Sequence, residues 1–178
     1  MHPKMPDRRS PDVNNPDLAV CTPMPDRVHT FRMKTGSWTT SLPEGHLRIG
    51  ISRGMPRFGV GKGFRLYRKL NPGPWFNRVE TAEYLERYQT EILGRLDPAQ
   101  TLAEIEGLAR GQIPVLCCYE RVGSGQWCHR ALAAQWFFKS LGIRVPEVAH
   151  EGLPQEQHPM LPPEQKHAGR SGFGRSIC

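Results

Sequence analysis

The stretch Ile113-Pro-Val-Leu-Cys-Cys-Tyr119 decides the fold class, because it is an unbroken apolar run with the length of a strand. Apolar residues on both faces are typical of a strand that is covered on both sides, as in a parallel sheet. Residues 47–52 alternate apolar with small or polar positions, which predicts a second strand. Residues 143–148 predict a third strand. Together these segments favour a mostly parallel sheet.

Two helices are marked by clear start and stop signals. One begins at Asp97-Pro-Ala-Gln100, whose first two residues suit the N-cap and the first helical position, and it stops at Gly111. The other begins near Cys128 and ends at Gly142. A further helix is predicted around residues 84–92. The order strand, helix, helix, strand, helix, strand predicts a single three-layer α/β domain with right-handed crossovers.

The composition places this domain at residues 31–150, between two tails. A chain of 178 residues is long enough for about one domain, and it can bury a core without a disulfide or a metal. Glycine (18 residues) and proline (17 residues) are abundant. Many of them fall in residues 1–30 and 151–178, and we expect both tails to be disordered.

The cysteine count and the apolar stretches predict a cytoplasmic protein. Five cysteines are an odd number, and Cys117 and Cys118 are adjacent, which argues against a secreted disulfide framework and favours reduced thiols. The longest apolar stretches are far shorter than a membrane span, so we expect no membrane partner. The polar, proline-rich residues 1–10 do not resemble a signal peptide. The sequence leaves the oligomeric state open.

The junction between the strand at 113–119 and the helix that follows it is the candidate site. Open α/β sheets bind ligands beyond the carboxyl ends of their strands, and the free amides of a helix start favour anions. Here Arg130 supplies a planar donor set for phosphate or carboxylate, and His129 titrates near neutral pH. The helix start would lower the pKa of the Cys128 thiol, and Glu120 adds a carboxylate. We expect a small anion or a nucleotide-like ligand at this junction.

A second group of candidate residues follows the other clear strand. If that strand lies parallel to 113–119, then Ser52, Arg53 and Arg57 emerge at the same edge of the sheet as Cys128. These residues would join the ligand-binding side of the site.

Two functions follow from these residues. In an enzyme acting on a phosphorylated or nucleotide-like substrate, the arginines would hold the anion and Glu120 or His129 would act as acid or base. Cys128 would then be the nucleophile or a donor lining the site. The alternative is a nucleic-acid-binding module without catalysis, based on residues 45–79, which hold eight Lys and Arg, no Asp or Glu, and interleaved aromatic side chains. Whether the protein is an enzyme stays open.

Structural roles compete with each of these assignments. Cysteines are commonly buried, so the two adjacent cysteines are expected to pack in the core. Arg130 could simply pair with Glu120. Cys118, Cys128 and His129 could form part of a zinc site, but the gap of ten residues and the lack of a Cys-x-x-Cys pair argue against one. The sequence alone therefore assigns no metal and no cofactor.

The strand end Leu116-Cys-Cys-Tyr-Glu120 and the helix start Trp127-Cys-His-Arg-Ala-Leu-Ala-Ala134 resemble the family known as domain of unknown function 488. The stretch Arg48-Ile-Gly-Ile-Ser-Arg-Gly-Met-Pro-Arg57 and the turn Asn71-Pro-Gly-Pro-Trp-Phe76 are similar to its bacterial and phage-associated branch. The resemblance covers about residues 31–149 and implies a three-layer α/β fold, but no established activity. It places the family motif on Glu120, Cys128, His129 and Arg130, and on Ser52, Arg53, Pro56 and Arg57.

Overall fold

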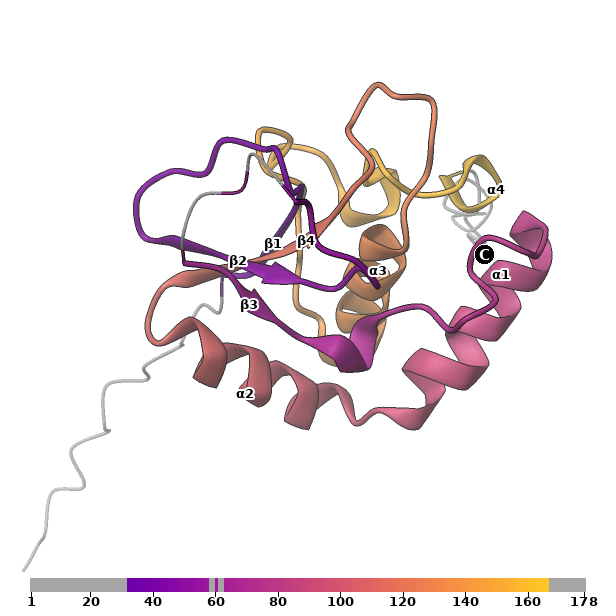
Figure 1. The fold of residues 1–178 in the computed structure, drawn as a ribbon, viewed down its shortest axis with the longest axis horizontal. Helices are drawn as coiled ribbons and strands as arrows, with labels where there is room; N and C mark the ends of the chain where they lie inside the picture. Colours follow the sequence, from indigo (N-terminus) through magenta and orange to yellow (C-terminus); the bar gives the residue numbers. More distant parts are fainter. Residues whose placement is uncertain (1–31, 58–59, 61–62, 167–178) are drawn as a thin grey trace, which may run out of the picture. The chain divides into compact units, whose positions relative to one another are not determined.

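The computed structural model describes residues 32–57, 60 and 63–166 (Figure 1). The strands are β1 (Lys34–Ser37), β2 (His46–Gly50), β3 (Arg65–Leu66) and β4 (Ile113–Cys118). The α-helices are α1 (Thr81–Arg87), which continues as a π-helical segment (Tyr88–Ile92) and a 3₁₀ turn (Leu93–Arg95), α2 (Pro98–Ala109), α3 (His129–Leu141) and α4 (Pro163–Lys166). Further 3₁₀ helices lie at Arg68–Leu70 and Gln155–Gln157. In these described ranges, no helix has the length and apolar character needed to cross a membrane.

The four strands form one sheet in the order β1-β4-β2-β3, and every pairing is parallel. β4 is central, because Gly36 of β1 and Gly50 of β2 both pair with Cys117. Every residue of β4 after Ile113 is buried. The mostly parallel sheet and the α/β class predicted from the apolar run are therefore confirmed.

Helices cover one face of the sheet. Ile49 of β2 and Leu116 of β4 point to this face, where they join a core with Ile105 of α2 and Phe137 of α3. All four side chains are fully buried, and α2 and α3 also contact each other. Each such apolar side chain stabilises the fold by about 1.5–3 kcal/mol relative to an exposed one. This packing holds the start of α3 beside the end of β4.

Loop segments cover the other face in the described part of the chain. Trp38, directly after β1, packs with Val115 and Cys117 of β4. Its ring meets Phe64 edge-on at a centroid distance of 5.5 Å. A Cβ on Gly50 would lie 2.5 Å from the Trp38 ring, so this close approach requires glycine. In the described residues, loops rather than a second layer of helices therefore cover this face.

The predicted helix boundaries are confirmed where local signals were strong. The Asp97 carboxylate accepts a hydrogen bond of 2.7 Å from the amide three residues further on, and Pro98 is the first residue of α2. After α2, Arg110 (φ 50°) and Gly111 (φ 84°) turn the chain through the left-handed region. Gly142 (φ 70°) ends α3 in the same way.

The strand predicted at residues 143–148 is reduced to a single bridge between Thr35 and Glu147. The segment does lie along β1, because the Thr35 amide donates to the Pro146 carbonyl and the Val148 amide donates to the Thr35 carbonyl, at 2.9 Å each. Proline has no amide to donate, so Pro146 interrupts the ladder. β1 and β3 went unpredicted because they are only four and two residues long.

Residues 151–166 are folded onto the domain, so the predicted boundary at residue 150 is wrong. Met160 and Leu161 are buried in the main core, and the Met160 carbonyl accepts the Cys128 amide at 2.9 Å. The burial of these two apolar side chains outweighs the proline content that favoured disorder. The remaining parts of the predicted tails, residues 1–30 and 167–178, lie outside the described residues.

Candidate functional site

A cavity of about 260 Å³ opens at the carboxyl ends of β2 and β4. These neighbouring strands lead to opposite edges of the sheet: β2 is followed by β3, whereas β4 is followed by α3 and the segment beside β1. Open α/β sheets bind ligands in the crevice that such a reversal creates. The cavity is lined by residues from three segments, 52–54, 72–84 and 118–129. The predicted meeting of the two strand ends therefore takes place.

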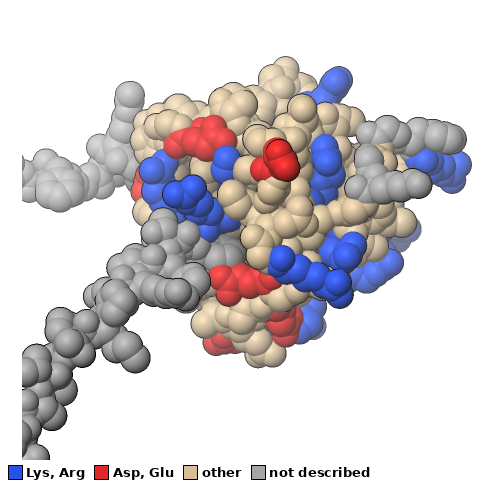
Figure 2. Space-filling model, turned by 90° about the vertical axis from the view of Figure 1, so that its left-hand side faces the viewer, with Lys and Arg blue, Asp and Glu red and all other residues tan. Residues whose placement is uncertain are grey.

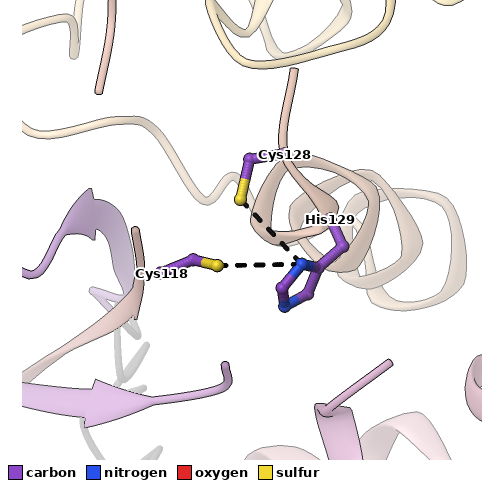
Figure 3. Close-up of side chains that lie close together, drawn as sticks. All are labelled: Cys118, Cys128 and His129. Carbon is purple, nitrogen blue, oxygen red and sulfur yellow. Dashed lines mark hydrogen bonds between the residues drawn. The ribbon is translucent and has the colours of Figure 1, made fainter. Parts of the chain in front are cut away.

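His129, the first residue of α3, is held between Ile51, which directly follows β2, and two cysteines. Its Nε2 atom lies 2.9 Å from the carbonyl oxygen of Ile51, which makes Nε2–H the donor and Nδ1 the acceptor. Nδ1 faces the Sγ atoms of Cys118 at 3.8 Å and Cys128 at 3.9 Å, as Figure 3 shows. All three side chains are buried and line the cavity. The structure thus brings together a cluster that the sequence spacing argued against.

The predicted activation of the Cys128 thiol is wrong. Cys128 is the N-cap residue of α3, as expected, but it is only 2 % exposed. Burial raises the pKa of this thiol well above its ordinary value, and the neighbouring Cys118 raises it further. Desolvation therefore outweighs the partial positive charge of the helix start, and Cys128 is not set up as a free nucleophile.

Glu120 brings a negative charge to the cavity. Burial raises the pKa of its carboxyl, but the neighbouring thiols of Cys128 and Cys118 and its own backbone amide lower it by more. The pKa therefore lies below its ordinary value. The Oε2 atom of Glu120 is buried and has no hydrogen-bond partner in the described part of the chain. A buried carboxylate oxygen without a partner is costly, so this position favours a donor or a cation.

Arg130 is not the ligand contact that the sequence predicted. It is fully buried, and its Nε and Nη2 atoms each donate to the Glu147 carboxylate at 3.0 Å. Its Nη1 atom donates to the backbone carbonyl of Glu120 at 2.7 Å. Each of the three guanidinium nitrogens of Arg130 thus donates one hydrogen bond within the fold, and its ionic partner is Glu147 rather than the Glu120 carboxylate.

Ser52 and Arg57 also differ from their predicted roles as ligand contacts. Ser52 lines the cavity, but its hydroxyl accepts a hydrogen bond of 2.9 Å from the Trp38 indole and donates to the Gly54 carbonyl at 2.7 Å. The hydroxyl proton is therefore already used in a hydrogen bond within the fold. Arg57 is exposed and lies outside the cavity lining.

Arg53 is the predicted arginine that the structure does place at the cavity. Its guanidinium lies over the ring of Phe76, 5.8 Å from the ring centroid, and Nη1 donates to the Pro72 carbonyl at 3.2 Å. Phe76 is 42 % exposed and lines the cavity, whereas the adjacent Trp75 is buried in the core. Arginine above an aromatic ring gains a cation–π contact that fixes its orientation.

Sequence reasoning missed a buried polar network around Glu147. The Thr35 hydroxyl donates to Glu147 at 2.7 Å and lies 2.7 Å from Nε2 of His158. Because Nδ1 of His158 accepts the Met160 amide at 3.2 Å, its Nε2–H is the donor to Thr35. One sequence signal was present: a lone carboxylate within the apolar stretch Val145-Pro-Glu-Val148 indicates a buried partner.

Compared with models of protein families, with curated proteins and with solved structures, the chain gives no match. The resemblance to the family of domain of unknown function 488 therefore stays a prediction. The fold and the cavity define a parallel α/β domain with a small crevice where the strand order reverses.

Proposed function

We propose that this protein binds a small phosphate-bearing or nucleotide-like molecule in the cavity at the ends of β2 and β4. The observation that carries this proposal is that Arg53 and the first turn of α3 border the same cavity. A helix start carries a partial positive charge, and arginine presents a planar set of donors. Both features favour phosphate oxygens.

Arg53 is the cation in position to hold the phosphate. The Pro72 carbonyl uses one of the five N–H donors of its guanidinium. Within the described ranges, no ion pair joins Arg53 to a carboxylate. By contrast, Lys69 from the same basic segment pairs with Glu104 at 2.8 Å. The charge of Arg53 is therefore available to a ligand.

Glu120 would set the orientation of the ligand. Its negative charge repels a phosphate, so the anion would bind against Arg53 rather than against Glu120. The unpartnered oxygen of Glu120 would attract a hydrogen-bond donor or a cationic group of the same ligand. A nucleoside phosphate or sugar phosphate carries both an anion and hydroxyl donors, which suits this polarity.

The size and walls of the cavity narrow the ligand class. Phe76 (42 % exposed) and Tyr119 (47 % exposed) both line it, so partly exposed aromatic side chains are available for a base or sugar to pack against. The cavity volume of about 260 Å³ is slightly smaller than that of typical ligand pockets, which span ~300–1,000 Å³. A monophosphate therefore suits the cavity better than a dinucleotide.

The alternative function, nucleic-acid binding along residues 45–79, has weaker support. Arg48 donates to two backbone carbonyls, and Lys69 is paired with Glu104. On the face that Figure 2 shows, groups of Lys and Arg are separated by Asp, Glu and uncharged side chains. Tracking a nucleic-acid backbone requires a continuous basic path.

Thermal shift of the full chain tests the proposal, because a bound ligand stabilises the folded state. The ligands are inorganic phosphate, nucleoside monophosphates, sugar phosphates and a single-stranded oligonucleotide. We expect a monophosphate to stabilise the protein. In Arg53→Ala its Kd should rise about 10-fold to 150-fold, which corresponds to the ~1.5–3 kcal/mol of a charged hydrogen bond.

Arg57→Ala is the matched control, because Arg57 belongs to the same basic segment but lies outside the cavity lining. It should bind the monophosphate as the unaltered protein does. Equal losses in both variants, with steeply salt-dependent binding of the oligonucleotide, would favour the nucleic-acid alternative. If no phosphate compound stabilises the protein, the proposal is wrong.

A further inference from the structure

Cys118, Cys128 and His129 bring three metal-binding atoms together at the wall of the cavity. The two Sγ atoms and Nδ1 of His129 all lie within 4.8 Å of one another, and all three residues are buried. We propose that this cluster binds a zinc ion, with the fourth coordination position open to the cavity. The proposal rests on the geometry of the cluster and does not depend on the phosphate ligand.

The distances in the cluster are close to those of a zinc site. Zinc bound tetrahedrally at ~2.3 Å from sulfur and ~2.0 Å from nitrogen holds these ligand atoms roughly 3.5 Å apart. The observed Sγ···Nδ1 distances are 3.8 Å for Cys118 and 3.9 Å for Cys128. Figure 3 shows both sulfur atoms pointing toward Nδ1, one from the end of β4 and one from the start of α3. Small rotations of the side chains would complete the site.

The backbone carbonyl of Ile51 prepares His129 for metal binding. It accepts the Nε2–H proton at 2.9 Å, so the lone pair of the ring is on Nδ1, the atom that faces the cysteines. Histidines that bind metals almost always donate their other ring nitrogen to a carbonyl or carboxylate in this way. The tautomer and the ring orientation that zinc requires are therefore fixed.

The two cysteines are anchored through their own backbones. The Cys118 carbonyl accepts the Trp38 amide at 2.8 Å, and the Cys128 amide donates to the Met160 carbonyl at 2.9 Å. Both residues lie at the ends of regular elements, β4 and α3. Ligands held by regular elements keep their geometry better than ligands on free loops.

Cys117 shows what a cysteine with a packing role looks like in this protein. It lies on the other face of β4, where its thiol donates to the Val115 carbonyl at 3.3 Å and burial raises its pKa to about 12. Cys118 and Cys128 instead both point at Nδ1 of His129. One metal ion in the space between these three atoms would bind all of them at once.

The charges of the cavity also balance when zinc is bound. The ion displaces one proton from each thiol, two protons pass to solvent, and the two thiolates neutralise Zn²⁺. The unpartnered Oε2 of Glu120 then has a cation, or a water bound to it, as its neighbour. Three protein ligands with an open position are typical of catalytic zinc sites, since structural sites have four. A water in that position would be acidified, and Glu120 could accept its proton.

The test uses the full chain in a Cys21→Ser, Cys178→Ser background, purified with a reductant, so that the three core cysteines are the thiols present. We expect about one zinc per chain by elemental mass spectrometry, in line with one three-ligand site. Cobalt added to the chelator-treated protein should give the absorption of a tetrahedral thiolate complex. X-ray absorption of the zinc form should show two sulfur atoms at about 2.3 Å and nitrogen at about 2.0 Å.

Cys118→Ser and Cys128→Ser should each weaken zinc binding by at least about 100-fold. Loss of a residue that only supports a metal ligand typically weakens binding by about 10-fold to 100-fold, so a larger loss indicates a direct ligand. Cys117→Ser is the matched control and should keep full affinity. If the serine variants do not fold, X-ray absorption of the protein with all three core cysteines intact still shows whether sulfur binds the zinc. Folded protein that takes up no zinc, or a zinc spectrum without sulfur, overturns the proposal. Zinc uptake without phosphate binding would refute only the proposed function, and the reverse result would refute only this inference.

Discussion

The guanidinium of Arg130 and the carboxylate of Glu147 form a buried ion pair with two hydrogen bonds of 3.0 Å each. Thr35 and His158 extend this pair on the side of Glu147. On the other side, Arg130 holds the backbone carbonyl of Glu120. The network therefore links β1, α3 and the turn at His158 to Glu120, the carboxylate that lines the cavity.

Loss of Arg130 should destabilise the fold rather than merely weaken ligand binding. Arg130→Met leaves the buried Glu147 carboxylate without its partner, which costs about 3–5 kcal/mol in the free energy of unfolding. Replacing both partners, Arg130→Met with Glu147→Leu, should cost less than the sum of the single changes. Urea denaturation measures these losses. The exposed Arg121→Ala should change stability by under about 0.5 kcal/mol; a similarly small loss in Arg130→Met would contradict the role of the ion pair.

His158 should make stability depend on pH. Burial lowers its pKa from 6.5 to about 3, and the charge of Arg130 contributes. The unfolded chain binds the proton more readily, so the contribution is complete above pH 6.5 and is lost as the pH falls toward 3. The free energy of unfolding should therefore decrease by up to ~1.4 kcal/mol per pH unit below this point.

Urea denaturation between pH 6.5 and pH 4.5, the ordinary pKa values of histidine and glutamate, measures this slope. His158→Gln should flatten it, because the variant has no imidazole to titrate at this position. An equal slope in the unaltered protein and in His158→Gln would assign the pH dependence to other groups.

The core thiols should react slowly in the native protein. Cys117, Cys118 and Cys128 are all buried, and burial raises the pKa of Cys128 in spite of its place at a helix start. Labelling with a chromogenic disulfide reagent, in the Cys21→Ser, Cys178→Ser background, should become fast only when urea unfolds the chain. Rapid labelling of Cys128 in the native state would instead support the activated thiolate that the sequence predicted.

Gly50→Ala and Gly107→Ala should change stability in opposite directions. A Cβ on Gly50 would lie 2.5 Å from the rigid Trp38 ring, and overpacking of this kind typically costs ~1–3 kcal/mol. Gly107 lies in α2 with open space around the added Cβ, so alanine there should stabilise by about 0.5–1 kcal/mol. Thermal denaturation compares the two; a neutral Gly50→Ala would mean that Trp38 can move away.

The features predicted correctly are those that local signals determine. Asp97 with Pro98 and the left-handed Gly142 mark helix ends through nearby backbone groups, and the apolar residues of β4 identify a central strand. The convergence of Arg53 with the start of α3 follows from one further rule, that parallel strands share their carboxyl edge. These inferences need no knowledge of distant packing.

The roles of Cys128 and Arg130 could not be predicted, because distant segments determine them. Met160 covers the Cys128 backbone, and Glu147 takes the Arg130 side chain away from the cavity. Both partners come from segments that carried weak or misleading signals. The cysteine–histidine cluster was disfavoured for a related reason, since spacing rules describe ligands on one short loop rather than on a strand end and a helix start.

The packing of Met160 and Leu161 determines where this domain can be cut. A fragment that stopped at residue 150 would lose two core side chains and leave the Cys128 amide without its acceptor. Such a fragment would expose apolar surface next to the crevice and would be expected to aggregate or to show misleadingly weak binding. Protein prepared for crystallisation or for ligand screening should therefore keep the chain at least through Lys166.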